Sequence, residues 1–381
     1  ERTVESPGDY DRGKWLEIVG RCGVESVNAK RLSTALEHFS RVYGGTRFAR
    51  EAEPVVRALR DVCAAAEETV SAGGRGQAPP AAGQTKDPAQ LEAELIKANP
   101  HVEAAHVKIV CGEAGSPRRV EIISPHLEDL SPLTGAGTLR EVCCGGGPSS
   151  REWADEPVAP LGDISALKGL RLEYIYLGLT SVQDLSPLEG MPLREVVIRH
   201  SPVTDIRVLE GMRLESCDLL GTKVRDVSPL RGMDIVKLDL GLTEVSDIGP
   251  LGGMPLESLR VCGTRVRDLS CLRQRSLDSL DMSDTGVLDF SFLAGLKLRG
   301  LSLSGTAVRS IDVLEGMPLE LLKLENTRVR DIDALRGMPL KILFISGTDV
   351  DDLSVLRGAP LEILHVRGCP IRSLSPLAGM P

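Results

Sequence analysis

Aromatic residues are scarce in this chain: Phe, Trp and Tyr make up 3% of its 381 residues, although 42% of the residues are hydrophobic. A chain of this length exceeds one ordinary hydrophobic core. Its core must therefore come from Leu, Val, Ile and Met. This composition favours many similar small layers over one large core.

Two further absences exclude classes of protein. No run of 18 apolar residues occurs, so no membrane-spanning helix is expected in this segment. The formal net charge is −9 with Arg and Asp interspersed, whereas a nucleic-acid-binding domain usually carries a basic excess. We therefore expect no nucleic-acid partner.

The cysteines show no CxxC spacing, and their number is odd, so they predict neither a zinc site nor a disulfide framework. Several fall on core positions of the repeat described below, where a free thiol acts as a small hydrophobe. Unpaired cysteines favour a reducing, cytoplasmic location. The chain starts at Glu1 without Met and ends inside a repeat, which indicates a fragment, so the missing targeting segment leaves the compartment open. The nine cysteines are Cys22, Cys63, Cys111, Cys143, Cys144, Cys217, Cys262, Cys271 and Cys369.

An internal repeat of 21 residues dominates the remainder of the chain. Its marker is an Asp or Ser that recurs ten times at intervals of 21 residues without one insertion. An earlier, irregular copy carries Asp129. The regular markers are Asp163, Asp184, Asp205, Asp226, Asp247, Asp268, Asp289, Ser310, Asp331, Asp352 and Ser373.

The consensus of the repeat is L-x-x-L-x-L-x-x-T-x-V-x-D-L-S-P-L-x-G-M-P. Its first half is the strand pattern of a leucine-rich repeat. Ser as N-cap followed by Pro predicts a short helical turn on the opposite side of each coil, and the Thr hydroxyl is expected to bond to the turn backbone. We therefore predict an α/β fold, a right-handed curved solenoid with short parallel strands on its concave face. Residues 127–381 would form about 11–12 coils.

The segments before and within the array have other patterns. Residues 1–72 show the apolar spacing of helices, and their alanine and aromatic placement resembles that of a tetratricopeptide-like hairpin. Residues 73–88 have the composition of a flexible linker. Residues 89–126 predict a helix and a β-hairpin that cap the solenoid, and residues 145–157 predict a surface loop inserted between two coils.

The unit DLSPLxGMPL with Thr at its ninth position resembles the 21-residue repeats of planctomycete-type bacteria. The lead-in ELIKANPHVEAAHVKIVCGEAGSPRRVEIIS resembles the segment that precedes such repeats in multidomain serine/threonine kinases. Internalin repeats are more distantly similar, with a period of 22 and Asn in place of Thr. The resemblance covers about residues 89–381 and implies a leucine-rich-repeat fold. A kinase Gly-rich loop, HRD and DFG are all absent from the sequence.

The concave face should present the third, fifth and seventh residues of each coil. Two groups of apolar side chains occur there, where polar ones are expected. Leu321, Ile342, Ile363 and Phe344 form what we term the apolar stripe, and Lys323 and His365 lie beside it. Either the stripe binds a partner, or further coils or a cap cover it. Tyr174, Tyr176 and Val197 form the N-terminal patch, which either binds a partner or packs under the 145–157 loop.

The six histidines are scattered and the Asp residues recur with the repeat, so we expect no catalytic, cofactor or metal site and no enzyme activity. The sequence favours a scaffold for protein–protein interaction, with a protein partner on the concave face. Two alternatives stay open. The chain is either the sensory or docking region of a serine/threonine kinase whose catalytic domain lies elsewhere, or a surface adhesin of internalin type. The oligomeric state cannot be derived from the sequence.

Overall fold

The computed structural model describes residues 86–112, 115–146 and 158–380. The chain divides into two units, Glu1–Ala81 and Ala82–Pro381. The predicted helical segment 1–72, the predicted linker up to residue 85 and residues 147–157 of the predicted loop lie outside the described residues. The second unit carries the whole repeat array.

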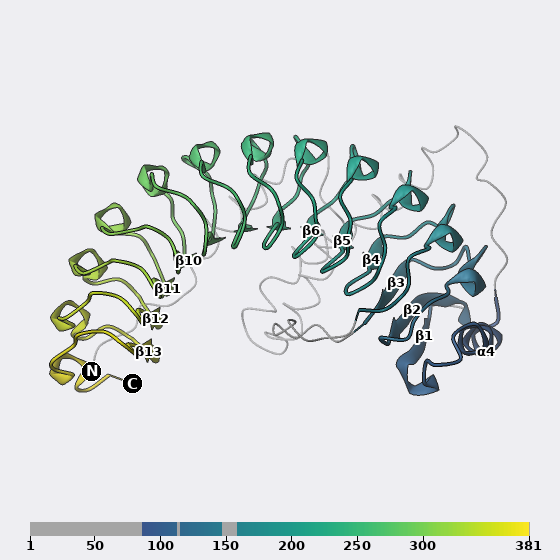
Figure 1. The fold of residues 1–381 in the computed structure, drawn as a ribbon, viewed down its shortest axis with the longest axis horizontal. Helices are drawn as coiled ribbons and strands as arrows, with labels where there is room; N and C mark the ends of the chain where they lie inside the picture. The colour runs from purple at the N-terminus through teal and green to yellow at the C-terminus, as the bar shows by residue number, and fades with distance from the viewer. Residues whose placement is uncertain (1–85, 113–114, 147–157, 381) are drawn as a thin grey trace, which may run out of the picture. The chain divides into compact units, whose positions relative to one another are not determined.

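Each repeat forms one coil, with a short strand on one side and a 3-10 turn on the other (Figure 1). The strands form a 13-stranded sheet in sequence order. Strand β1 is antiparallel to β2, and the strands from β2 onward pair in parallel. The strands are β1 (Val107–Cys111), β2 (Pro117–Ile123), β3 (Glu141–Gly145), β4 (Tyr174–Tyr176), β5 (Glu195–Val197), β6 (Ser216–Asp218), β7 (Lys237–Asp239), β8 (Ser258–Arg260), β9 (Ser279–Asp281), β10 (Gly300–Ser302), β11 (Leu321–Lys323), β12 (Ile342–Phe344) and β13 (Ile363–His365).

The strands line the inner side of the arc that the coils describe, and the 3-10 turns line its outer side (Figure 1). The predicted solenoid is therefore confirmed, and in the described part of each coil the helical element is a three-residue 3-10 turn. These turns are Ala104–His106 before β1, then Ser131–Leu133, Ser165–Leu167, Ser186–Leu188, Arg207–Leu209, Ser228–Leu230, Gly249–Leu251, Ser270–Leu272, Ser291–Leu293, Asp312–Leu314, Asp333–Leu335, Ser354–Leu356 and Ser375–Leu377.

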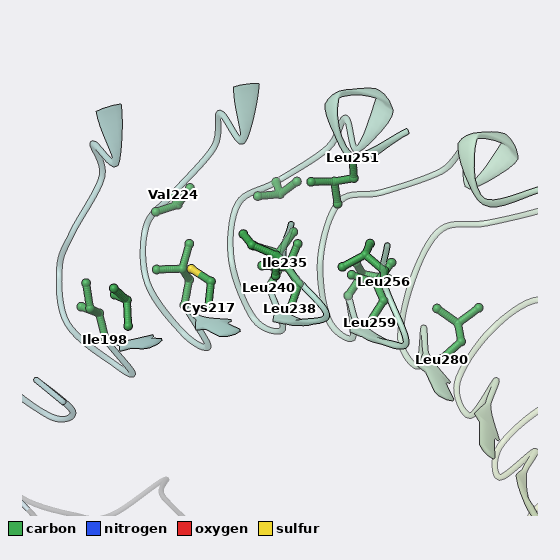
Figure 2. Packing of buried hydrophobic residues seen from close by; sticks show 14 of the residues in the cluster. Ile198, Cys217, Val224, Ile235, Leu238, Leu240, Leu251, Leu256, Leu259 and Leu280 are labelled. Carbon is green, nitrogen blue, oxygen red and sulfur yellow. The ribbon is translucent and has the colours of Figure 1, made fainter. Parts of the chain in front are cut away.

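The core is one continuous column of hydrophobic, mainly aliphatic side chains between the strands and the 3-10 turns (Figure 2). The middle residue of each strand points into it because side chains alternate along a strand: Leu238 of β7 and Leu259 of β8 are at most 2% exposed. Leu251 reaches the same core from its 3-10 turn. One coil alone could not bury this face, so each coil depends on its neighbours.

The start of each 3-10 turn differs from the prediction. Ser at this point is not an N-cap but the first residue of the turn, as in Ser228–Leu230, and the residue before it makes no side-chain capping bond. The carboxylate two residues before the Ser accepts its main-chain N–H instead, as Asp226 Oδ1 does from Ser228 at 2.8 Å. The repeating Asp therefore has a defined role, which is to hold the chain as it enters the turn.

The eighth residue of the coil, just after the strand, takes a left-handed backbone conformation. Gly263 has φ +65°, and its counterpart Leu242 has φ +55° with its side chain 57% exposed. A residue other than Gly is strained there. The bend brings the ninth residue, usually Thr, back into the interior.

Helix α4 (Pro88–Ala98) precedes the first strands. Asp87 caps it by accepting the N–H of Gln90, and Leu91 and Leu95 bury its apolar side in the core. Asn99, 2% exposed, then joins the helix to the first coil: its side chain donates to the Asp129 carbonyl and accepts the Asp129 N–H. None of the described helices is long and apolar enough to cross a membrane.

Candidate interaction surface on the strand face

Strands β4 to β13 present two in-register rows of side chains on the inner face of the arc. The register is direct, because the first and third residues of each strand pair with their equivalents on the next strand. The first row, at the third position of the coil, contains Tyr174, Glu195, Ser216, Lys237, Ser258, Ser279, Gly300, Leu321, Ile342 and Ile363. The second row, at the fifth position, contains Tyr176, Val197, Asp218, Asp239, Arg260, Asp281, Ser302, Lys323, Phe344 and His365.

The structure brings the three aliphatic members of the apolar stripe side by side. Leu321 pairs with Ile342, and Ile342 pairs with Ile363. Leu321 and Ile342 are partly exposed, and Ile363 is 44% exposed. The earlier members of this row, from Ser216 to Gly300, are polar, charged or Gly, so the aliphatic segment is confined to the last three strands.

The second row carries what we term the ring ladder, Lys323, Phe344 and His365, which are paired in register. The rings of Phe344 and His365 stack with centroids 4.1 Å apart and an interplanar angle of 7°. Lys323 Nζ lies 5.4 Å from the Phe344 centroid, within the range of a cation–π contact. The stacking orders three long side chains next to the stripe before any partner is present.

Between the two apolar ends of the face lies a chain of ion pairs that the sequence did not single out. Arg199 Nη2 lies 2.5 Å from Asp218 Oδ2. Arg260 reaches Asp239 at 2.7 Å on one side and Asp281 at 3.5 Å on the other. The charged residues at the fifth position, Asp218, Asp239, Arg260 and Asp281, were visible in the sequence. The partners were not, because an Arg can reach the strand before or after its own.

The two central carboxylates are almost fully covered, with Asp218 9% and Asp239 8% exposed. Each also accepts a main-chain N–H, Asp218 from Leu220 and Asp239 from Gly241. Burial raises the pKa of Asp239 to about 6, and the charge of Asp218 adds to this shift against the pull of Arg260. These two carboxylates are therefore satisfied internally and offer little free charge to a partner.

The N-terminal patch is largely buried. Tyr176 and Val197 are each 8% exposed and pack with Cys143, while Tyr174 is partly exposed at the edge of this cluster. The Tyr176 ring lies so close to Gly178 that a Cβ there would come within 2.4 Å of Oη. Of the three predicted residues, Tyr174 alone presents substantial surface, and burial raises the pKa of its hydroxyl.

The described residues give little support for reactive chemistry. No group of three or more His, Cys, Asp or Glu in the described part of the chain is arranged to hold a metal ion. Burial raises the pKa of the Cys143 and Cys262 thiols to about 11 each, so both stay protonated near neutral pH and are poor nucleophiles.

Comparison with known proteins shows which solved structures have a similar fold. No family model and no curated protein matches the chain. Among solved structures, an internalin (inlF) from Listeria monocytogenes is similar with a TM-score of 0.57 and 20% identity, over 79% of this chain and 95% of the internalin. A leucine-rich-repeat protein from Leptospira interrogans has a TM-score of 0.40 and 14% identity, over 74% of this chain and 93% of that protein.

The chain thus has the leucine-rich-repeat solenoid fold, which it shares with the internalin. At these identities the likeness concerns the fold alone. It does not distinguish the planctomycete kinase-associated type of repeat from other types.

Proposed function

We propose that this chain is a non-enzymatic binding module that holds a protein partner on its strand face. The contact is centred on the apolar stripe and the ring ladder: Leu321, Lys323, Ile342, Phe344, Ile363 and His365. One observation carries the proposal. Three aliphatic side chains and an aromatic ring stand together, partly accessible to solvent, on a face whose equivalent positions on strands β6 to β10 are polar, charged or Gly.

Solvent-exposed apolar clusters of this kind mark interaction sites in folded proteins. Complete burial of each Leu, Ile or Phe side chain contributes about 1.5–3 kcal/mol, so a partner that covers four of them gains enough to offset part of the entropy lost on association. On the central part of the same face, Arg199 and Arg260 are already paired with carboxylates of the chain, so neither is free to bind phosphate groups. This supports a protein partner over a nucleic acid.

The test is affinity capture from native lysate with the full chain as bait, quantified by mass spectrometry. Ile342→Asp and Phe344→Asp should each lower recovery of the specific partner by about tenfold or more, because one buried carboxylate costs at least about 1.4 kcal/mol at an interface. Both positions are partly exposed, so the variants should fold, which circular dichroism checks.

The matched control is Ser258→Asp on β8, which has the same position in its coil as Ile342 and lies four coils earlier. It should leave recovery unchanged. Equal recovery with Ile342→Asp, Phe344→Asp and the parent chain would refute the stripe as the binding site.

The kinase-docking and adhesin alternatives would use the same face, and no described residue favours either over a general binding module. The N-terminal patch remains a hypothesis for a second contact, made through Tyr174. Tyr176 and Val197 would support that contact from below, since both are buried.

A further inference from the structure

We infer that the apolar stripe receives an amphipathic α-helix of the partner, which lies across β11, β12 and β13 and places a carboxylate beside Lys323. This inference rests on the proposed function and specifies the chemistry of the partner. Its basis is the spacing of the stripe, the occupied faces of the Phe344 ring and the unpaired cations on one flank.

The spacing of the stripe matches one side of a helix. Leu321, Ile342 and Ile363 stand on three adjacent strands, which are about 4.8 Å apart, so the row spans about 9.6 Å. Residues i and i+7 of a helix are about 10.5 Å apart along its axis, with i+3 or i+4 between them. Three consecutive apolar turns of a helix would therefore meet the three aliphatic side chains one to one.

An extended segment fits less well. Residues on one face of a strand recur about every 6.8 Å, so three of them span about 13.6 Å. This exceeds the row by about 4 Å. An extended segment that ran along one strand, instead of across the strands, would meet only one member of the row. The helix is the regular backbone that engages all three.

The ring ladder limits which partner side chains can pack against Phe344. The Phe344 ring lies between Lys323 of the preceding strand and His365 of the following strand, and it contacts both. Its faces are thereby used within the protein, and only its edge is left for the partner. Aliphatic side chains pack against a ring edge without a free face, which suits the Leu and Ile stripe of an amphipathic helix.

Charge differs between the two flanks of the stripe. On the flank before the strands, Glu320 is already paired with Arg299 and with Lys341. On the ladder flank, neither Lys323 nor Arg367 has a carboxylate within 4 Å among the described residues. Glu325, two residues after Lys323 in the same coil, also makes no ion pair among the described residues. The surplus is positive, so an acidic side chain is expected on that flank of the partner helix.

The experiment is a selection of 18-residue peptides from a random display library on the full chain, with counter-selection on the Phe344→Asp chain. The inference predicts enriched peptides with apolar residues at i, i+3 or i+4, and i+7. They should become helical on binding, measured by circular dichroism of the synthetic peptide. Pro in the middle of the apolar stretch should weaken binding about tenfold or more, and the same Pro at the peptide end should not.

The predicted contact between Lys323 and a carboxylate of the helix is tested separately with the best enriched peptide. Lys323→Glu should weaken binding about fivefold, and a change of the peptide's acidic residue to Lys should restore it. Lack of restoration would remove the carboxylate from the inference.

Other outcomes separate this inference from the proposed function. Enriched peptides that need Phe344 but alternate in polarity and tolerate the central Pro would overturn the helix and leave the binding module standing. A selection that yields no peptide dependent on Phe344 or Ile342 would count against both.

Discussion

A buried threonine hydroxyl closes the turn after the strand in most coils. Its Oγ1 donates to the carbonyl three residues earlier, at 3.1 Å or less, and the residue is at most 7% exposed. The sequence predicted a bond from this hydroxyl to the turn backbone, and the structure confirms it. The residues that make the bond are Thr180, Thr222, Thr243, Thr264, Thr285, Thr306, Thr327 and Thr348.

Ser201 occupies the same position between Thr180 and Thr222, and its Oγ is buried without a hydrogen-bond partner. Ser201→Thr should stabilise the chain by about 1 kcal/mol, because the branched side chain favours the rotamer that makes the bond and its methyl group fills the core. Thr222→Ser is the reverse control and should destabilise by a similar amount. Chemical denaturation measures both. A Ser201→Thr chain less stable than the parent would show that this site is not an incomplete copy of the Thr turn.

The ring ladder could be predicted from the sequence in its strand positions but not in its side-chain contacts. The repeat period placed Lys323, Phe344 and His365 on neighbouring strands, and the structure agrees. The stacking of Phe344 on His365 depends on side-chain rotamers and on how closely the strands approach. Neither quantity is encoded in spacing alone.

At the scale of the element, the recurring Asp defines where each 3-10 turn begins. The sequence located these turns correctly but assigned the cap to Ser. The Asp side chain can reach the N–H two residues ahead only in the bent conformation seen at the turn entry, a geometry that a helix-capping rule does not consider. Ser310 and Ser373 replace the Asp in two coils and accept the same N–H through Oγ.

Asp268, which accepts the Ser270 N–H at 2.8 Å, tests this role. Asp268→Ala should lower the midpoint of thermal unfolding by on the order of 1 °C, and Asp268→Ser should recover most of the loss, as Ser310 does naturally. The hydrogen bonds from Ser270 lower the pKa of Asp268. A lowered folded-state pKa contributes stability above the ordinary Asp value and loses it as the pH falls through the folded value. The difference between the parent and Asp268→Ala should therefore vanish in acid, and a difference that grows on acidification would contradict the assignment.

The segment before the repeats could also be predicted only in part from the sequence. We keep as a proposal that residues 89–126 cap the solenoid, supported by Leu91 and Leu95 in the shared core and by pairing of β2 with β3. The role of Asn99 could not be derived from the sequence, because its bonds to Asp129 join residues 30 positions apart.

At the scale of the whole molecule, the exact repeat period predicts the order, direction and register of the strands from β4 to β13, and the structure agrees. The ion pairs between coils were harder to predict. Arg199 pairs with a later coil at Asp218, whereas Arg260 pairs with both an earlier coil at Asp239 and a later one at Asp281. These choices depend on three-dimensional distances between neighbours, which the period leaves open.

The account rests on coils stacked in register, with the middle residue of each strand inside and its neighbours on the face that meets the partner. Leu301, in the middle of β10, is 0% exposed, and Leu301→Asp would bury an unpaired charge at a cost of about 3 kcal/mol or more. Ala307 is exposed in the same coil, and the equivalent residue 42 positions later is Asp349, so Ala307→Asp is the matched control.

Guanidinium denaturation of the two variants is the most direct measurement. The account predicts a clearly lower unfolding midpoint for Leu301→Asp and a midpoint close to that of the parent chain for Ala307→Asp. Equal midpoints for the two variants would contradict it.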